Sequence, residues 1–202
     1  MHWIVGVLFL LYAFVDVNYF IWSIILITAY ALKWKRTARC SLLDPDCYTG
    51  ISFPSDIDHL WHMNNAKYLR AFEFARAVFG LKNKLWATAR KLDAKMLIAS
   101  QAVRYRKPLT VFQWYRITTK VVFIEGRDLY VEQQLVTTSD NFVRATCMVK
   151  LTMTKGMVED VLRAMNLDPS VCPKEMPVEV AHFIAYNEAN SSRLNPAKAK
   201  ES

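Results

Sequence analysis

The sequence predicts an α+β fold in which an antiparallel sheet wraps around one long central helix, preceded by an N-terminal hydrophobic membrane segment. Three observations predict it. The chain begins with a long apolar run, residues 66–79 carry apolar side chains at three- and four-residue intervals, and much of residues 94–153 is rich in alternating β-branched and aromatic residues. About 150 residues remain after the apolar run, which is the size of one ordinary domain, so we expect a single core.

The N-terminal run, from Trp3 to Leu32, is almost wholly apolar and is interrupted by Asp16 and Asn18. A membrane span needs ~20 apolar residues, so residues 1–36 are interpreted as a transmembrane signal anchor with a basic flank. The flank consists of Lys33, Lys35 and Arg36, followed by Arg39. Basic flanks collect on the cytosolic side, which would place the folded domain in the cytosol.

Two alternatives for this segment stay open. A cleaved signal peptide would make the protein secreted, although Met1 and His2 do not supply the basic start that such peptides have. Two short segments could instead form a re-entrant hairpin, because Asp16 would be costly at the centre of a bilayer.

The folded part is expected to begin after a polar connector over residues 37–50. A short strand over Ile51–Phe53 leads to a buried helix over Asn65–Gly80, where glycine is a plausible stop. A second, more polar helix is expected over Lys82–Leu92. Four strands should follow, near Ala94–Arg106, Trp114–Glu125, Leu129–Thr138 and Phe142–Met153.

The last two hairpins have clear turn signals. Glu125-Gly126-Arg127-Asp128 and Ser139-Asp140-Asn141 separate the last three expected strands. The main domain is therefore assigned to residues 51–155, and residues 156–202 to an extension that packs on it, with an amphipathic stretch over Met157–Met165.

The net charge of +8 invites a nucleic-acid interpretation, but the basic residues are scattered among acids and apolar strands. No nucleic-acid partner is expected. Membrane headgroups and a phosphate-bearing substrate suit the excess positive charge better. The four cysteines have no CxxC pair and no Cys/His spacing typical of zinc, so we expect no metal and no cofactor.

One segment carries a family motif. Residues 56–68 have the form D-x-D-x-x-x-H-x-N-N-x-x-Y, which resembles the acyl-thioesterases of the hot-dog superfamily. The continuation Y-x-x-x-x-E-x-A-R, from Tyr68 to Arg76, is similar to the helix of 4-hydroxybenzoyl-CoA thioesterases. Arg104-Tyr105-Arg106-Lys107-Pro108-Leu109 looks like the strand end Y-x-x-P-L of that family. The resemblance implies the hot-dog fold.

A closer resemblance is to the thioesterase superfamily member six proteins. It includes the core D-I-D-H-L-W-H-M-N-N-A-K-Y-L-R, the hydrophobic leader, and the tail from His182 to Ser192. The resemblance implies a membrane-anchored, thioesterase-like protein of lipid metabolism. It would reside in the endoplasmic reticulum or secretory system, and with the orientation given by the basic flank we expect an endoplasmic reticulum membrane protein whose domain faces the cytosol.

Thioester hydrolysis needs a carboxylate that activates water or attacks the carbonyl, and donors for the oxygen that becomes negative. Asp58 is the expected base or nucleophile and His62 its polar partner. Glu73 is a third catalytic candidate, which the resemblance implies, because a helix carboxylate serves as base or nucleophile in related families. The free N–H groups near Asn64–Ala66 could polarise the carbonyl.

Each of these residues also has a structural interpretation. Asp58 could cap its loop, His62 could be a packed histidine, and Glu73 with Arg76 could be a helix ion pair. The expected substrate-binding residues are Asn64, Asn65, Tyr68, Arg104, Arg106 and Lys107. Of these, Asn64 and Asn65 also suit caps and turns, Tyr68 suits the core, and the basic residues suit either coenzyme A phosphates or a solvated face.

Two functions follow. The first is an acyl-CoA thioesterase that acts on fatty acyl thioesters. The second is an inactive hot-dog domain that binds acyl-CoA or serves as a scaffold at the membrane. Leu60 favours the second function, because plant acyl-carrier-protein thioesterases have Asn at that position. Lys107 and Pro108 favour it too, because those enzymes have Glu and Cys there. Relatives pair edge strands, so a homodimer is expected.

Overall fold

The computed structural model describes residues 2–32, 41–173 and 175–194. The chain divides into two compact units, residues 1–39 and 40–202, and each is described by itself. The expected basic flank, Lys33 to Arg39, lies outside the described residues.

The N-terminal unit contains two helices, α1 (His2–Phe14) and α2 (Val17–Leu32). Asp16 begins α2, because its carboxylate accepts the N–H of Tyr19 at 3.1 Å and its backbone carbonyl accepts the N–H of Phe20 at 3.3 Å. The polar residue that interrupts the apolar run therefore ends one helix and caps the next.

The expected N-terminal membrane segment is thus divided into two helices. Among the described residues, none of the helices combines the length and hydropathy needed to cross a membrane. The physical reason is length, since 13 and 16 helical residues reach only about 20 and 24 Å, whereas a bilayer core is about 30 Å thick.

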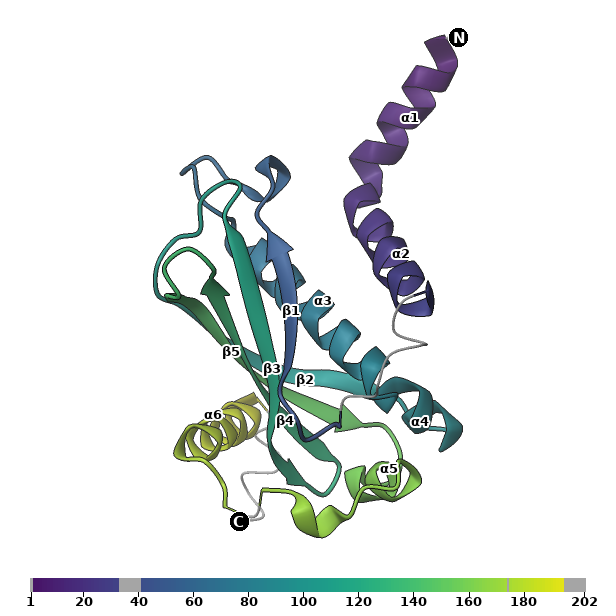
Figure 1. The fold of residues 1–202 in the computed structure, drawn as a ribbon, viewed down its shortest axis with the longest axis vertical. Coiled ribbons are helices and arrows are strands. Elements are labelled where there is room, and N and C mark those ends of the chain that lie inside the picture. Colours follow the sequence, from purple (N-terminus) through teal and green to yellow (C-terminus); the bar gives the residue numbers. More distant parts are fainter. Residues whose placement is uncertain (1, 33–40, 174, 195–202) are drawn as a thin grey trace. The chain divides into compact units, whose positions relative to one another are not determined.

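The second unit is built on a five-stranded antiparallel sheet with the strand order β1-β3-β4-β5-β2 (Figure 1). The strands are β1 (Asp46–Ile51), β2 (Met96–Tyr105), β3 (Trp114–Glu125), β4 (Asp128–Thr137) and β5 (Val143–Met153). The last four agree with the expected strands to within two residues. β1 pairs with β3 along its whole length, from Asp46 opposite Thr119 to Ile51 opposite Trp114.

β1 begins earlier than expected. Residues 46–50, which were expected in the connector, belong to the sheet, and the expected strand at Ile51–Phe53 ends at Ile51. Only Ser41–Pro45 precede the sheet as described connector, and Leu42 there is fully buried in the core.

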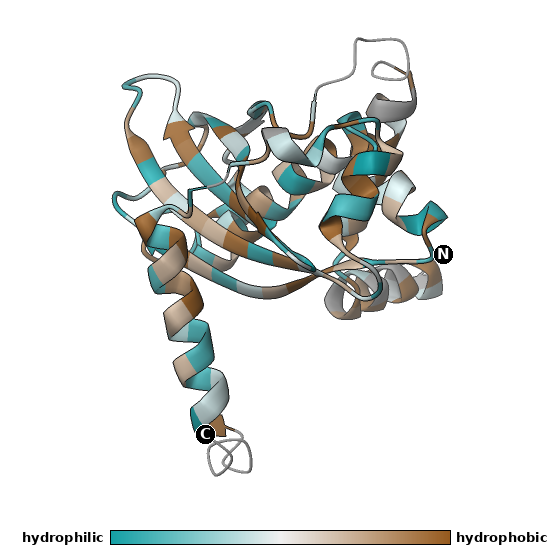
Figure 2. Cartoon of the chain, turned by 90° about the horizontal axis from the view of Figure 1, so that it is seen from below, coloured by the Kyte–Doolittle hydropathy of each residue, from teal (hydrophilic) through white to brown (hydrophobic). Residues whose placement is uncertain are grey.

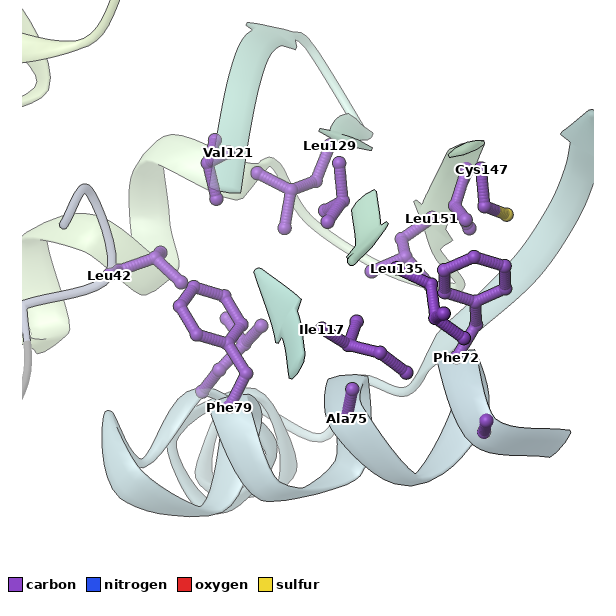
Figure 3. Packing of buried hydrophobic residues seen from close by; sticks show 14 of the residues in the cluster. Leu42, Phe72, Ala75, Phe79, Ile117, Val121, Leu129, Leu135, Cys147 and Leu151 are labelled. Atoms are coloured by element: carbon purple, nitrogen blue, oxygen red, sulfur yellow. The ribbon is translucent and has the colours of Figure 1, made fainter. Parts of the chain in front are cut away.

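Helix α3 (Asn65–Lys82) packs against one face of the sheet. Figure 3 shows Phe72 and Ala75 pointing from this helix towards Leu135 and Ile117 on the strands, and Phe79 pointing towards Leu42. The strands alternate hydrophobic and hydrophilic residues, as the colours of Figure 2 show, because successive strand side chains point to opposite faces. The expected α+β hot-dog architecture is confirmed for this unit.

The helix passes the expected stop at Gly80 and ends at Lys82, before α4 (Leu85–Lys91). Gly80 has a packing role instead. A Cβ at this position would lie 2.1 Å from Nε1 of Trp86, so only glycine lets the indole of α4 cross the end of α3.

The opposite face of the sheet is covered by α6 (Val178–Leu194), which the sequence did not reveal as a helix. Val180 and Phe183 pack there against Val122, Phe123 and Tyr130. A bulge between Val121 and Phe123 places Phe123 opposite Tyr130 on this outer face. The expected amphipathic stretch forms α5 (Val158–Ala164), whose buried Val158, Val161 and Leu162 join the main core.

Candidate functional site

The loop before α3 is held by two aspartates. The side chain of Asp56 accepts the N–H of Phe53 at 2.9 Å, and its backbone carbonyl accepts the N–H of Asn64 at 2.8 Å. The side chain of Asp58 accepts the N–H of Leu60 at 2.9 Å, while its backbone carbonyl accepts the N–H of Trp61 at 3.0 Å. Both carboxylates therefore organise this loop.

The same turn brings Asp58 and His62 together. Asp58 Oδ1 lies 3.6 Å from His62 Nδ1, and the two side chains are 16% and 29% exposed. The backbone N–H of Asp58 also donates to the carbonyl of His62 at 2.9 Å, which closes the turn. The expected pairing of these two residues is present in the structure, and so is the loop-capping role of Asp58.

Helix α3 begins directly behind this turn. Asn64 is the N-cap, since its side-chain oxygen accepts the N–H of Ala66 at 2.9 Å. Asn65 is the first helical residue, so its N–H has no acceptor within the helix. The helix dipole adds partial positive charge at this end.

A pocket of about 250 Å³ opens at this helix end. Its lining comes from the loop before α3, the first turns of α3 and the chain after β2. The lining residues are His62, Met63, Asn65, Tyr68, Tyr105, Arg106, Lys107 and Pro108.

Two tyrosines form one wall of the pocket. The hydroxyl of Tyr68 accepts the N–H of Leu109 at 3.0 Å, and the hydroxyl of Tyr105 donates to the carbonyl of Asn65 at 3.2 Å. Their rings meet edge to face, with centroids 5.3 Å apart. Burial raises the pKa of Tyr68 and of Tyr105, so both hydroxyls are neutral donors at physiological pH.

The other side of the pocket is basic. Arg106 and Lys107 both lie over the ring of Phe142, at 5.0 and 5.5 Å from its centroid. Arg144 lies over the same ring but forms an ion pair with Asp140 at 2.5 Å. In the described part of the chain, neither Arg106 nor Lys107 forms an ion pair with a carboxylate, so their charges remain available to an anion.

The structure brings five of the nine expected site residues to this pocket: His62, Asn65, Tyr68, Arg106 and Lys107. Asp58 stands behind His62, and Asn64 serves as the cap. Glu73 is exposed farther along α3, and Arg104 is exposed on β2; neither lines the pocket. The expected Glu73–Arg76 pairing is not the main contact of Arg76, whose guanidinium is buried and donates to Gln133 at 2.5 Å.

Sequence reasoning missed Met63, Tyr105 and Pro108 as lining residues. A signal for the last two was present, because both belong to the Y-x-x-P-L stretch that carries the family resemblance. Met63 has no comparable signal, since its position depends on a hydrogen bond from its N–H to the carbonyl of Leu109 at 2.7 Å.

Comparison with solved structures supports the fold. Slr0204, a 1,4-dihydroxy-2-naphthoyl-CoA thioesterase from Synechocystis, superposes with a TM-score of 0.55 over 63% of this chain and 98% of that chain, at 7% identity. SAV2348 from Staphylococcus aureus, solved in complex with CoA, superposes with a TM-score of 0.50 over 71% of this chain and 96% of that one, at 13% identity.

Sequence relatives are closer. The model of the thioesterase-like superfamily matches residues 53–172. Protein THEM6 of Drosophila melanogaster is 34% identical over 98% of this chain and 100% of its own length. Protein THEM6 of Xenopus laevis is 31% identical over 94% of this chain and 89% of its own length. The chain therefore belongs to the thioesterase-like superfamily and, within it, to the family of the THEM6 proteins.

Proposed function

We propose that the chain hydrolyses fatty acyl thioesters of coenzyme A at the pocket beside the N-terminus of α3, as part of lipid metabolism. One observation carries the proposal. A histidine beside a carboxylate, a helix N-terminus and two cations that form no ion pair among the described residues converge on one pocket of about 250 Å³. Thioester hydrolysis needs a general base and donors to the carbonyl oxygen, and cations suit the phosphates of coenzyme A.

In this proposal the thioester carbonyl lies against the N–H of Asn65, where the helix dipole favours the negative charge that develops on oxygen. Asp58, through His62 at 3.6 Å, takes a proton from a water molecule as that water attacks the carbonyl carbon. The carbon–sulfur bond then breaks, and the proton passes to the leaving thiolate of coenzyme A. The products are a fatty acid and free coenzyme A.

Arg106 and Lys107 would bind the phosphates of coenzyme A. Both are exposed at the pocket mouth and lie over the ring of Phe142, which holds them side by side. Guanidinium and ammonium groups pair well with phosphate. The coenzyme A thioesterase and the CoA complex among the similar structures make this ligand class the natural one to test.

A second function, acyl-CoA binding without hydrolysis, has its own observation. Asp58 lies outside the pocket lining, and its carboxylate already accepts the N–H of Leu60. A base that is occupied in capping a loop has less freedom to activate water. Leu60 itself is apolar and cannot orient a water molecule.

Release of free thiol from a panel of acyl-CoAs by the full chain separates the two functions. His62→Ala should lower the rate by about 100-fold if His62 takes part in proton transfer. His59→Ala is the matched control, because His59 is an exposed neighbour outside the pocket. If the wild-type chain binds acyl-CoA and releases no thiol, hydrolysis is ruled out and the binding function remains.

We also propose that the protein acts at the endoplasmic reticulum membrane, with its domain facing the cytosol, through the apolar helices α1 and α2. Their exposed side chains include Trp3, Phe9, Phe14, Ile24 and Ile27. Alkaline extraction of cell membranes tests it: a membrane-embedded chain stays in the pellet, and a peripheral or secreted chain is released.

A homodimer is proposed through β2, which is an edge strand of the sheet. Its exposed Leu97 and Ile98 would be covered by the same strand of a second copy. Ile98→Lys should then shift the protein from dimer to monomer in analytical ultracentrifugation, and a wild-type monomer would contradict the proposal.

A further inference from the structure

Three loops lie towards one end of the sheet (Figure 1), and two of them contribute residues to the pocket. They are residues 53–64, 106–113 and 138–142. The N–H of Met63 donates to Leu109 at 2.7 Å, and the N–H of Phe112 donates to Ser52 at 2.7 Å. The third loop is tied to the sheet by the N–H of Thr138, which donates to Trp114 at 3.0 Å. These bonds make one continuous surface, which we call the loop-end surface.

The loop-end surface exposes large apolar side chains. Trp61 is 83% exposed, Phe112 is 61% exposed, and Trp114, the first residue of β3, is 55% exposed. Leu60 and Val111 are exposed beside them. Proteins usually bury side chains of this size, so several exposed together mark a place that contacts something else.

The backbone adds a second sign. Trp61 and Phe112 both have a φ of +60°, in the left-handed region that bulky residues rarely adopt. Strained backbone positions persist where the surrounding structure holds them, and they cluster at sites that bind a ligand or change conformation. Here both side chains are mostly exposed, so the folded domain gains little packing from either one.

The charge of this surface is positive. Arg106, Lys107 and Arg116 lie on it, and none of the three forms an ion pair in the part of the chain that the structure describes; Arg116 bonds the neutral side chain of Asn141 at 2.9 Å. The aspartates at the same end of the sheet already have partners within the domain. Asp56 pairs with Lys67 at 3.6 Å, Asp58 lies 3.6 Å from His62 Nδ1, and Asp140 pairs with Arg144 at 2.5 Å. A hydrogen bond from Thr137 lowers the pKa of Asp140, and the positive charge of Lys107 also helps to lower it.

We propose that the loop-end surface docks on the surface of an anionic lipid bilayer, with Trp61 and Phe112 in the interfacial layer and the basic side chains on lipid phosphates. Tryptophan is the residue most typical of the membrane interface, and unpaired cations are attracted to anionic headgroups. A second copy of the chain suits this surface less well, because a two-fold contact would bring together two surfaces that both carry the positive charges of Arg106, Lys107 and Arg116.

This docking surface consists of residues of the second unit alone, and the proposal does not rest on thioester hydrolysis. It shares Arg106 and Lys107 with the pocket, whose mouth would then lie at the boundary between lipid and water. An acyl-CoA dissolved in the membrane presents its phosphates at that same boundary.

The test uses the full chain, reconstituted into vesicles that contain brominated phosphatidylcholine, with or without phosphatidylserine. The fluorescence of wild type minus that of Trp61→Phe isolates Trp61 among the six tryptophans, and phenylalanine keeps the apolar contact. We expect the bromine to quench Trp61 in vesicles with phosphatidylserine and several-fold less in phosphatidylcholine alone. Arg106→Gln with Lys107→Gln should lower the docking equilibrium constant about fivefold per charge removed.

Lys84→Gln with Lys91→Gln is the matched control, since it removes two exposed charges from the region of α4, away from the loops, and should leave the quenching unchanged. Three results would overturn the proposal. Trp61 could be quenched by acrylamide in water and not by bromine. It could be quenched equally in both lipids and in the charge variant. It could be shielded from both quenchers in a chain that sediments as a dimer, which would assign the surface to a second copy.

Discussion

Single buried polar groups connect the helix of this domain to its sheet. Gln133 on β4 accepts from Arg76 and donates to the carbonyl of Phe72 at 3.1 Å and to Thr119 at 3.0 Å. Burial lowers the pKa of the Arg76 guanidinium, whose positive charge is costly inside the protein. The network satisfies each buried group, so it fixes the position of α3 on the sheet.

The hydroxyl of Tyr68 serves both the core and the pocket. Tyr68→Phe would leave the buried N–H of Leu109 without its acceptor, and we expect the free energy of unfolding to fall by about 1–3 kcal/mol in urea titrations. Tyr186→Phe is the control, because Tyr186 is exposed on α6 and should change stability by less than about 0.5 kcal/mol. Equal effects of the two substitutions would mean that the Tyr68 bond adds nothing.

The buried thiol of Cys147 should make the free energy of unfolding fall at alkaline pH. Burial raises the pKa of its thiol from 9.0 to about 11, against a smaller lowering by Arg76. The unfolded chain therefore loses this proton at a lower pH than the folded one, so the stabilisation is complete below pH 9 and is lost as the pH rises towards about 11. Cys147→Ala should show a shallower fall in unfolding free energy over this window, and parallel curves would contradict the assignment.

At the scale of elements, each end or crossing of a helix discussed here depends on one residue whose side chain fits that position. Asp16 ends α1 and begins α2, Asn64 caps α3, and Gly80 lets α4 pack across the end of α3. In the last two cases the residue gives little helix propensity and is present for its end contact or its small size.

The contact between α3 and α4 can be tested by a double-mutant cycle. In an exposed helix, Gly→Ala stabilises by up to about 1 kcal/mol, but Gly80→Ala should destabilise by about 1–3 kcal/mol because the new methyl group meets Trp86. In a Trp86→Ala background the sign should reverse. Urea unfolding of the four proteins measures the coupling, and additive effects would show that the two residues do not interact.

At the scale of the whole molecule, the sheet of the second unit has a helix on each face. α3 covers the main core, and α6 covers a smaller cluster around Phe123 and Tyr130. The smaller cluster buries few residues, so α6 is expected to open at lower free energy than the sheet.

Phe183→Asp should therefore release α6 while the sheet remains folded. The expected result is cleavage near residues 173–178 at least about tenfold faster in limited proteolysis, with little change in the main unfolding transition. Ala185→Asp, at an exposed position two residues away, should leave the cleavage rate unchanged. Loss of the main transition in Phe183→Asp would mean that α6 and the sheet unfold as one unit.

The sequence by itself determined the elements whose periodicity is local. The apolar spacing after Asn65 predicted α3, and the alternation from Trp114 to Glu125 predicted β3 at its observed bounds. The motif around Asp58 and His62 was also local, and it marked the loop on which the pocket is built. Hydrophobic spacing indicates which residues of a helix or strand share a face, and this pattern can be read from a short stretch of neighbouring residues.

Only the tertiary structure decided which faces meet. The hydroxyl of Tyr105 donates to the carbonyl of Asn65, forty residues away in the sequence. Phe183 packs on the outer face of the sheet, beside the bulge at Val122. The use of the Asp58 carboxylate as a loop cap is equally invisible in the motif. These contacts depend on strand order and on turns that bring distant segments together, and no local pattern of residues records that pairing.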